Sequence, residues 1–273
     1  MNRTLQVLLL CTAPLLAQDN TEKATVPLSD PSRPARIRVH LMSGGVTVKG
    51  YDGKEVLVES RSRAGDGDEE RSSRPSRAEG MRRLQLPGNS GLDVTEEDNQ
   101  VVVKTESWNR PSDLVITVPR RSSLQLKCMN NGDIYVEGVS GEIDANNLNG
   151  KVTLKSVSGS VLAHSLNGEI TVSLDQIDPS KPMSFSTMNG DIDVTLPPAL
   201  KANVRLKTDH GDIYSDFDVK LDTSGAIKSE SGRQKDGSYH LKFDRTLRGT
   251  VNGGGPEFQF TSFNGQIYLR KRK

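Results

Sequence analysis

The residues best suited to acid–base or metal chemistry follow turn glycines. Asp133, Asp191 and Asp212 each come directly after a glycine, and Asp193 follows two residues later. A row of carboxylates along one edge of a sheet could bind a cation or flank a sugar. Lys151 occupies the position equivalent to Asp133 after the turn Asn149-Gly150. We therefore expect a solvated, charge-neutralised row rather than a pair of catalytic carboxylates.

Other chemical signals are scattered or incomplete. The sequence contains no Gly-x-Ser-x-Gly, no phosphate-binding loop and no His-Glu-x-x-His, and Gly253-Gly254-Gly255 lacks dinucleotide spacing. Asp66-Gly67-Asp68 lacks the remaining ligands of a calcium loop. The sequence predicts no catalytic residue, no cofactor site and no metal site, and hence a protein that is not an enzyme. The histidines lie far apart in sequence, at His40, His164, His210 and His240.

The two cysteines do not predict a disulfide. Cys11 lies in an N-terminal segment that we expect to be removed, which leaves Cys128 alone. Cys128 alternates with Leu124 and Leu126, as an inward side chain of a strand does. We expect it to be buried rather than reactive.

Residues 1–17 have the layout of a signal peptide. A positive start at Arg3 precedes the apolar run Thr4 to Leu16, and small Ala17 precedes a polar stretch. The sequence predicts cleavage near Ala17 and export to the periplasm, cell envelope or extracellular space. An uncut N-terminal anchor and a lipoprotein acylated at Cys11 are the alternatives, although bulky Leu10 disfavours the second. No later run is apolar enough for a transmembrane helix.

The remaining chain is patterned as strands without a long amphipathic helix. Residues 18–35 contain Pro27, Pro31 and Pro34, which predict a flexible lead-in without regular structure. Residues 36–128 alternate as short strands and predict an N-terminal β-rich capping part. A polar loop at 60–83 interrupts it.

From residue 131 onward, turn dipeptides recur every nine residues. Asn-Gly and Ser-Gly alternate, so the full repeat is eighteen residues. Two apolar columns follow the turns, and a third apolar residue precedes the next turn. These columns predict an all-β fold, a parallel β-solenoid with two strands per coil, over residues 129–273 and continuous with the capping part. The expected inward residues are Ile134, Ile143, Val152, Val161 and Ile170; Val136, Ala145, Leu154, Ala163 and Val172; and Val139, Leu148, Val157 and Leu166.

Outward residues support the same register. Asp133, Lys151 and Glu169 are eighteen residues apart, so opposite charges would alternate down the stack. Beyond residue 168 the repeat loosens, and residues 228–237 predict a polar loop or hairpin tip. Residues 258–269 are then expected to form the last coil, with a basic tail after it.

Three segments carry a family resemblance. They begin at Asn131-Gly132, at Ser43-Gly44 and at Gly249-Thr250, and the likeness spans roughly residues 36–270. They resemble a bacterial putative-adhesin family of exported domains of unknown function. The resemblance implies a β-solenoid, bacterial export and an adhesive role, and it brings no catalytic or binding residues. The charged insert at 60–83 departs from the family pattern.

Composition narrows the function further. The net charge is +1, so no basic excess indicates nucleic acid, and aromatic residues make up 4% of the chain. The sequence favours a non-catalytic exported scaffold of the cell envelope or surface, with a protein or glycan partner. A carbohydrate-active β-helix enzyme and an envelope assembly factor are the alternatives. The single tryptophan, Trp108, lies outside the repeats, which disfavours the enzyme.

Overall fold

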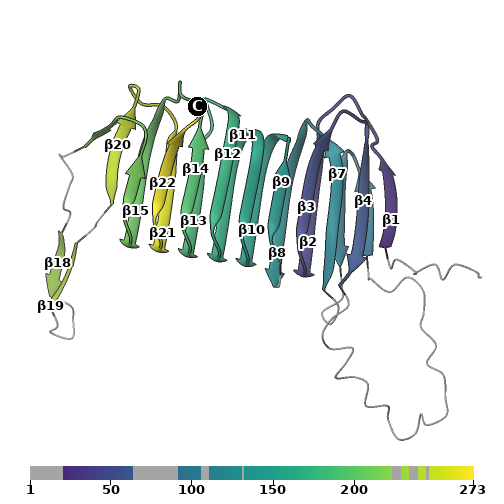
Figure 1. Ribbon diagram of the computed structural model, residues 1–273, viewed down its shortest axis with the longest axis horizontal. Coiled ribbons are helices and arrows are strands. Elements are labelled where there is room, and N and C mark those ends of the chain that lie inside the picture. The colour runs from purple at the N-terminus through teal and green to yellow at the C-terminus, as the bar shows by residue number, and fades with distance from the viewer. Residues whose placement is uncertain are drawn as a thin grey trace, which may run out of the picture.

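The computed structural model describes residues 21–63, 92–105, 111–130, 132–222, 229–233, 239–243 and 246–273 (Figure 1). These residues form strands β1 to β22, and no helix occurs among them. The predicted all-β class is therefore confirmed. The expected signal peptide at 1–17, residues 64–83 of the polar loop, Trp108 and Asn131 lie outside the described residues.

Twenty of the strands are arranged in two ladders, in which most neighbouring strands run parallel, and β18 and β19 form a separate two-stranded sheet. Ladder A has the order β5 (Leu92–Glu97), β6 (Gln100–Thr105), β2 (Ala35–Ser43), β8 (Ser122–Asn130), β10 (Ser140–Asn149), the second half of β11 (Val152–Asn167), β13 (Met183–Asn189), β21 (Glu257–Asn264), β15 (Ala202–His210), β20 (Leu247–Val251) and β17 (Val219–Leu221). Ladder B has the order β1 (Thr21–Pro27), β4 (Glu55–Ser62), β7 (Ser112–Pro119), β3 (Val46–Tyr51), β9 (Ile134–Glu137), the first half of β11, β12 (Ile170–Ile177), β14 (Ile192–Leu196), β22 (Ile267–Lys271) and β16 (Ile213–Ser215).

The eighteen-residue repeat appears directly as strand register. Ile143 on β10 pairs with Val161 on β11. Val152 pairs with Ile134 on one side and with Ile170 on the other. The strands are therefore stacked so that residues at equivalent repeat positions become lateral neighbours, roughly 4.8 Å apart.

Inward side chains of both ladders form one apolar core. Both predicted columns after the turns are buried, with Leu154 and Ile170 fully inaccessible to solvent. Where the repeat loosens, aromatic residues enter the core: Phe185 and Phe260 are buried and stack with ring centroids 5.0 Å apart. Burying aliphatic and aromatic side chains in this way supplies the main stabilisation of the fold.

The third predicted column is only half correct. Val139 and Val157 are buried, because the backbone turns at Gly138 and Ser156, which have φ of +67° and +48°. Leu148, in contrast, is 42% exposed, and Leu166 is half-buried. At the corner after Leu148 and Leu166 the alternation of inward and outward side chains continues without a break. The polar residues directly before these leucines, Asn147 and Ser165, therefore point inward instead.

Those inward polar residues are hydrogen-bonded to the backbone of the neighbouring turn. Asn147 donates to the Gly132 carbonyl at 3.0 Å, and the Ser165 hydroxyl donates to the Gly150 carbonyl at 3.0 Å. Thr187 repeats the contact with Gly168 at 2.9 Å. A buried carbonyl left without a donor would be costly, so this column is polar for a structural reason.

Chain order and spatial order differ at both ends. The C-terminal strands β21 and β22 lie between β13–β14 and β15–β16. The prediction that residues 258–269 form the last unit of the stack is therefore wrong. Likewise β2 and β3 lie between β6–β7 and β8–β9. Near each end of the stack, strands that are distant in sequence, β21–β22 or β2–β3, are therefore inserted between other strands.

The lead-in prediction also requires correction. Thr21–Pro27 form the edge strand β1, which pairs antiparallel with β4, and Lys23 forms an ion pair with Glu59 at 2.9 Å. Pro27 is tolerated because it ends a strand that has a partner on one side only. The division that we placed between residues 128 and 129 falls inside β8, which pairs with both β2 and β10. Of residues 228–237, only 229–233 are described; they form β18 (Ser229–Arg233), which pairs antiparallel with β19 (Tyr239–Phe243).

Candidate interaction surface

The carboxylates that follow turn glycines act as caps for neighbouring turns. Asp133 accepts a hydrogen bond from the Lys151 backbone N–H at 2.7 Å, and Asp191 accepts one from Gln266 N–H at 2.7 Å. Lys151 then forms an ion pair with Glu169 at 3.3 Å, which agrees with the expected neutralisation of the row. The carboxylates of Asp133, Glu169 and Asp191 are spaced along the stack, each with its own partner, and do not converge on one point.

Insertion of β22 separates the two aspartates that seemed equivalent in sequence. Ile192 and Ile213 each pair with Ile267 from opposite sides. Gln266 therefore lies between Asp191 and Asp212, and an amide replaces the carboxylate that a continuous acidic row would need. Among the described residues, no group of three histidine, cysteine or acidic side chains is placed to hold a metal ion.

The histidines are distributed over different strands. His40 lies between lysines, His164 Nδ1 is 2.8 Å from the Ser186 hydroxyl, and the His210 ring meets the Phe263 ring edge-on at 5.2 Å. The side chain of His240 lies outside the described part of the chain. Each of the three described histidines thus has separate surroundings, and the structure does not assemble them into a site.

Cys128 is buried, as its strand position predicted. Its side chain is 3% exposed between Leu41 and Asn147 on neighbouring strands. Burial, with a smaller effect of Asp133, raises the pKa of the thiol to about 12. A thiol in this state supplies almost no thiolate at neutral pH and is unsuited to nucleophilic catalysis.

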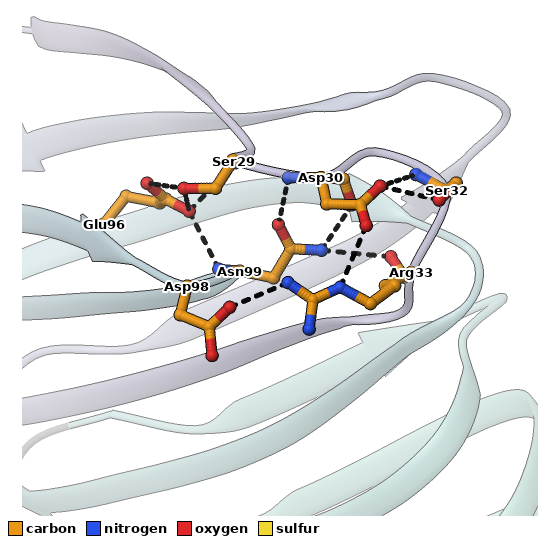
Figure 2. A network of polar contacts seen from close by, with 7 residues as sticks. All are labelled: Ser29, Asp30, Ser32, Arg33, Glu96, Asp98 and Asn99. Carbon is orange, nitrogen blue, oxygen red and sulfur yellow. Dashed lines mark hydrogen bonds and ion pairs between the residues drawn. The ribbon is translucent and has the colours of Figure 1, made fainter.

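A polar network lies at the N-terminal end of ladder A (Figure 2). Asn99 is its centre and is 3% exposed. Its Oδ1 accepts from the Asp30 N–H at 2.6 Å, and its Nδ2 donates to the Asp30 and Arg33 carbonyls at 2.5 and 3.3 Å. Glu96 accepts from the Ser29 and Asn99 N–H groups at 3.0 and 2.9 Å.

The charges of this network are satisfied within the chain. Hydrogen bonds from Ser32 lower the pKa of Asp30, and backbone and hydroxyl donation from Ser29 lowers the pKa of Glu96. The Asp98 carboxylate, 2.7 Å from Arg33, raises the pKa of that guanidinium. The network connects the loop before β2 to the β5–β6 turn. Because each carboxylate already accepts hydrogen bonds or forms an ion pair within the chain, we assign the network a structural role rather than a ligand-binding one.

An aromatic pair of one exposed and one half-buried tyrosine lies on the outer face of ladder B, near the end formed by β22 and β16. Tyr214 on β16 pairs with Tyr268 on β22, and their rings stack with centroids 5.3 Å apart and an interplanar angle of 12°. Tyr214 is 48% exposed. Parallel pairing brings the two rings together because both occupy the third position after a corner glycine, Gly211 and Gly265.

Polar groups surround this pair. The Arg270 guanidinium lies 5.2 Å from the Tyr268 ring centroid, and its Nε contacts both Asp193 carboxylate oxygens at 2.8 and 2.9 Å. Tyr268 donates to Gln266, and Tyr214 donates to Asp212 at 3.4 Å. The negative charge of Asp212 raises the pKa of Tyr214, and the hydrogen bond to Asp193 raises the pKa of Arg270.

We call these six residues the tyrosine surface: Tyr214, Tyr268, Arg270, Asp193, Gln266 and Asp212. It offers apolar rings beside fixed donors and acceptors, a composition typical of binding surfaces. Sequence reasoning missed it, because consecutive coils were assumed to be spatial neighbours. The sequence did contain one signal for it: Tyr214 and Tyr268 both occupy the third position after a turn glycine, as lateral neighbours would.

The comparisons with known proteins agree with the family resemblance. Residues 122–247, slightly less than half of the chain, match the family described as Toastrack DUF4097, a domain of unknown function. The predicted resemblance to a putative-adhesin family of unknown function is confirmed. No curated protein matches the chain.

Two solved structures are similar at low identity. One is described as a putative cell adhesion protein from Clostridium sporogenes ATCC 15579, with 7% identity, a TM-score of 0.43, and coverage of 92% of this chain and all of the other. The second is described as a putative adhesin from Bacteroides fragilis NCTC 9343, with 10% identity, a TM-score of 0.39, and coverage of 92% and 97%. Both likenesses are too distant to assign a shared function. In the described residues, no helix is long and apolar enough to cross a membrane.

Proposed function

We propose that this chain is a non-catalytic exported protein of the cell envelope or surface that acts as an interaction scaffold. The tyrosine surface is the observation that supports the proposal. It places two stacked tyrosines, an arginine and three polar acceptors on adjacent strands, with Tyr214 half-exposed. A protein or glycan partner would contact the rings and exchange hydrogen bonds with the surrounding polar groups.

The fold suits such a role through its rigidity. We take the two ladders as the faces of a β-solenoid with two strands per coil of about eighteen residues, capped by β1, β4 and β5 at one end and by β17 and β20 at the other. Tyr268 lies on β22, which has neighbours on both sides, and Tyr214 lies on β16, which pairs with β22. Side chains held on paired strands need little further ordering on binding. No cofactor is needed for this function.

Export is the second element of the proposal. The layout of residues 1–17 supports cleavage near Ala17, with the mature protein in the periplasm, the envelope or outside the cell. N-terminal sequencing of the protein from its native host tests this. Recovery of a cytoplasmic form that begins at Met1 contradicts it.

The scaffold role is tested by binding to envelope extract and to a glycan array. The double variant Tyr214→Ser, Tyr268→Ser should lose the bound partner. Tyr135→Ser should keep it, because Tyr135 is also an outward tyrosine of ladder B but lies on β9. Retention of the partner by the double variant contradicts the proposed surface. Degradation of an envelope polysaccharide that is lost in Asp191→Asn or Asp212→Asn would establish the enzyme alternative instead.

A further inference from the structure

An exposed apolar row lies along one corner of the molecule, on the opposite ladder from the tyrosine surface. Each member directly precedes the last residue of a strand on ladder A. Strand pairing at Asn130, Asn167, Asn189 and Asn264, with the hydrogen bond from Asn149 to Asn130, makes the members lateral neighbours in one continuous line. We call this row the apolar edge, and its members are Met42, Met129, Leu148, Leu166, Met188 and Phe263.

The apolar edge is well exposed to solvent. Met129, Leu148, Met188 and Phe263 are 49%, 42%, 46% and 42% exposed, and Met42 and Leu166 are half-buried. Six residues at strand spacing extend over roughly 24 Å. Scattered surface leucines need no explanation, but a continuous apolar row of this length is typical of a contact surface.

A second row runs beside the apolar edge, two residues earlier on the same outward face. Its members pair directly from strand to strand, and it contains three lysines, two histidines and no carboxylate. We call it the basic row, and its members are Lys104, His40, Lys127, Asn146, His164, Ser186, Thr261 and Lys207.

The nearby carboxylates do not cancel this charge. Across the corner, Asp133 and Asp191 accept backbone hydrogen bonds, and Glu169 forms an ion pair with Lys151. On ladder A, Asp93 and Asp209 lie beyond the two ends of the rows. Asp144 lies two residues before Asn146 on the same outward face and accepts a hydrogen bond from the Asn146 amide at 2.6 Å, so it offsets only part of the charge of the three lysines. None of Lys104, Lys127 and Lys207 has an ion pair among the contacts of the described residues, although Asp93 is the cross-strand neighbour of Lys104.

We propose that the apolar edge and the basic row together bind the surface of an anionic lipid bilayer. A straight row of apolar side chains with parallel cations matches a planar interface, where the apolar groups enter the headgroup boundary and the lysines meet lipid phosphates. A groove that binds a segment of a partner protein would need a raised rim on both sides. On the side of the apolar edge away from the basic row, the corner presents only the short asparagine side chains. The inference is independent of the tyrosine surface.

Vesicle flotation tests the proposal with the full-length chain. Leu8, Leu9 and Leu10 are replaced by serine in every sample, so that the apolar N-terminal run does not itself bind lipid. The protein should bind vesicles of equal parts phosphatidylglycerol and phosphatidylcholine, more weakly at high salt, and should bind pure phosphatidylcholine poorly. Absence of binding to the anionic vesicles overturns the proposal.

Two matched triple variants locate the contact. Met129→Ser, Leu148→Ser, Met188→Ser on the edge should weaken binding by about ten-fold or more. Leu162→Ser, Leu221→Ser, Leu247→Ser removes leucines that are 49%, 53% and 43% exposed on ladder A outside both rows, and should keep most of the binding of the parent. Equal binding by the two triple variants overturns the proposal.

A second measurement does not depend on the triple variant folding. Leu148→Trp should shift its fluorescence to shorter wavelength on anionic vesicles, and Leu221→Trp, on the edge strand β17, should not. Lys104→Ser with Lys127→Ser should weaken binding to anionic vesicles only. If sedimentation instead shows a dimer that the edge variant abolishes, while vesicles leave the Leu148→Trp emission unchanged, the edge binds a second copy and the proposal is wrong.

Discussion

Asn264 donates its side-chain amide to the Asn189 Oδ1 at 2.8 Å, although the two residues are 75 positions apart in the chain. Asn189 in turn donates to Asn167 at 2.7 Å, Asn167 to Asn149 at 2.9 Å, and Asn149 to Asn130 at 3.1 Å. One line of amides therefore crosses the point where the C-terminal strands enter the stack. It ties a late segment of the chain to the regular repeats.

Asn189→Ala should therefore destabilise the protein more than Asn130→Ala. Asn189 both donates and accepts within the line, whereas Asn130 only accepts at its end. At about 1 kcal/mol for each lost hydrogen bond, the expected losses are about 2 and about 1 kcal/mol. Denaturant unfolding measures both values. Equal losses would show that the amide line contributes little at the insertion point.

Gly159→Ala should cost more stability than Gly253→Ala. Both glycines have positive φ, +111° and +90°, so the backbone penalty is similar. A Cβ at Gly159 would lie 2.2 Å from the Gly141 carbonyl oxygen, whereas a Cβ at Gly253 would meet nothing within 4 Å. The expected losses are about 3 kcal/mol or more and about 1 kcal/mol. Chemical unfolding midpoints that shift equally would contradict the idea that corner glycines are required by stacking.

Much of the fold could be predicted from the regular repeats. Between residues 132 and 172 the nine-residue spacing fixed the turns, the parallel register and the inward columns, because each is a local consequence of strand alternation. The error at Leu148 arose from assuming that both corners reverse alternation. The alternation of inward and outward side chains reverses only at the corner that contains Gly138 and Ser156.

The insertion of β21–β22 could not be predicted in the same way. Its segment carries the same turn pattern as its neighbours, so local residues fit any place in the stack equally well. We attribute the choice of place to long-range packing of large side chains, such as Phe260 against Phe185. The tyrosine surface depends on that insertion, which is why sequence reasoning did not find it.

Leu154→Asp should unfold the protein, and Thr153→Asp should leave it folded. Leu154 is fully buried between Val136 and Val172, where an unpaired carboxylate costs several kcal/mol. Thr153 points outward and is half-buried beside Tyr135 and Thr171, so the expected loss is under about 1 kcal/mol. Thermal unfolding of both variants is the measurement. Similar melting temperatures would contradict the assigned inward face of β11.

Stability should decrease as the pH falls below about 6.5, and His40 should account for part of that decrease. His40 lies between Lys104 on β6 and Lys127 on β8, with Arg38 on its own strand. Partial desolvation of the exposed ring, followed by the charges of Lys127, Lys104 and Arg38, lowers the pKa of His40 from its ordinary value of 6.5. The unfolded chain therefore binds this proton more readily than the folded chain does, so acid favours unfolding between 6.5 and the lower folded pKa.

Replacing His40 by glutamine should remove that share of the pH dependence and leave stability above pH 6.5 nearly unchanged. Lys127→Gln should reduce the same dependence partially, because it removes one of the cations that oppose protonation. His164→Gln is the control, since its neighbours in the row are Asn146 and Ser186 rather than lysines. Free energies of unfolding measured on both sides of pH 6.5 decide the matter. If His40→Gln and the parent lose equal stability on acidification, the lysines do not act on His40, and the charge of the basic row is screened by solvent.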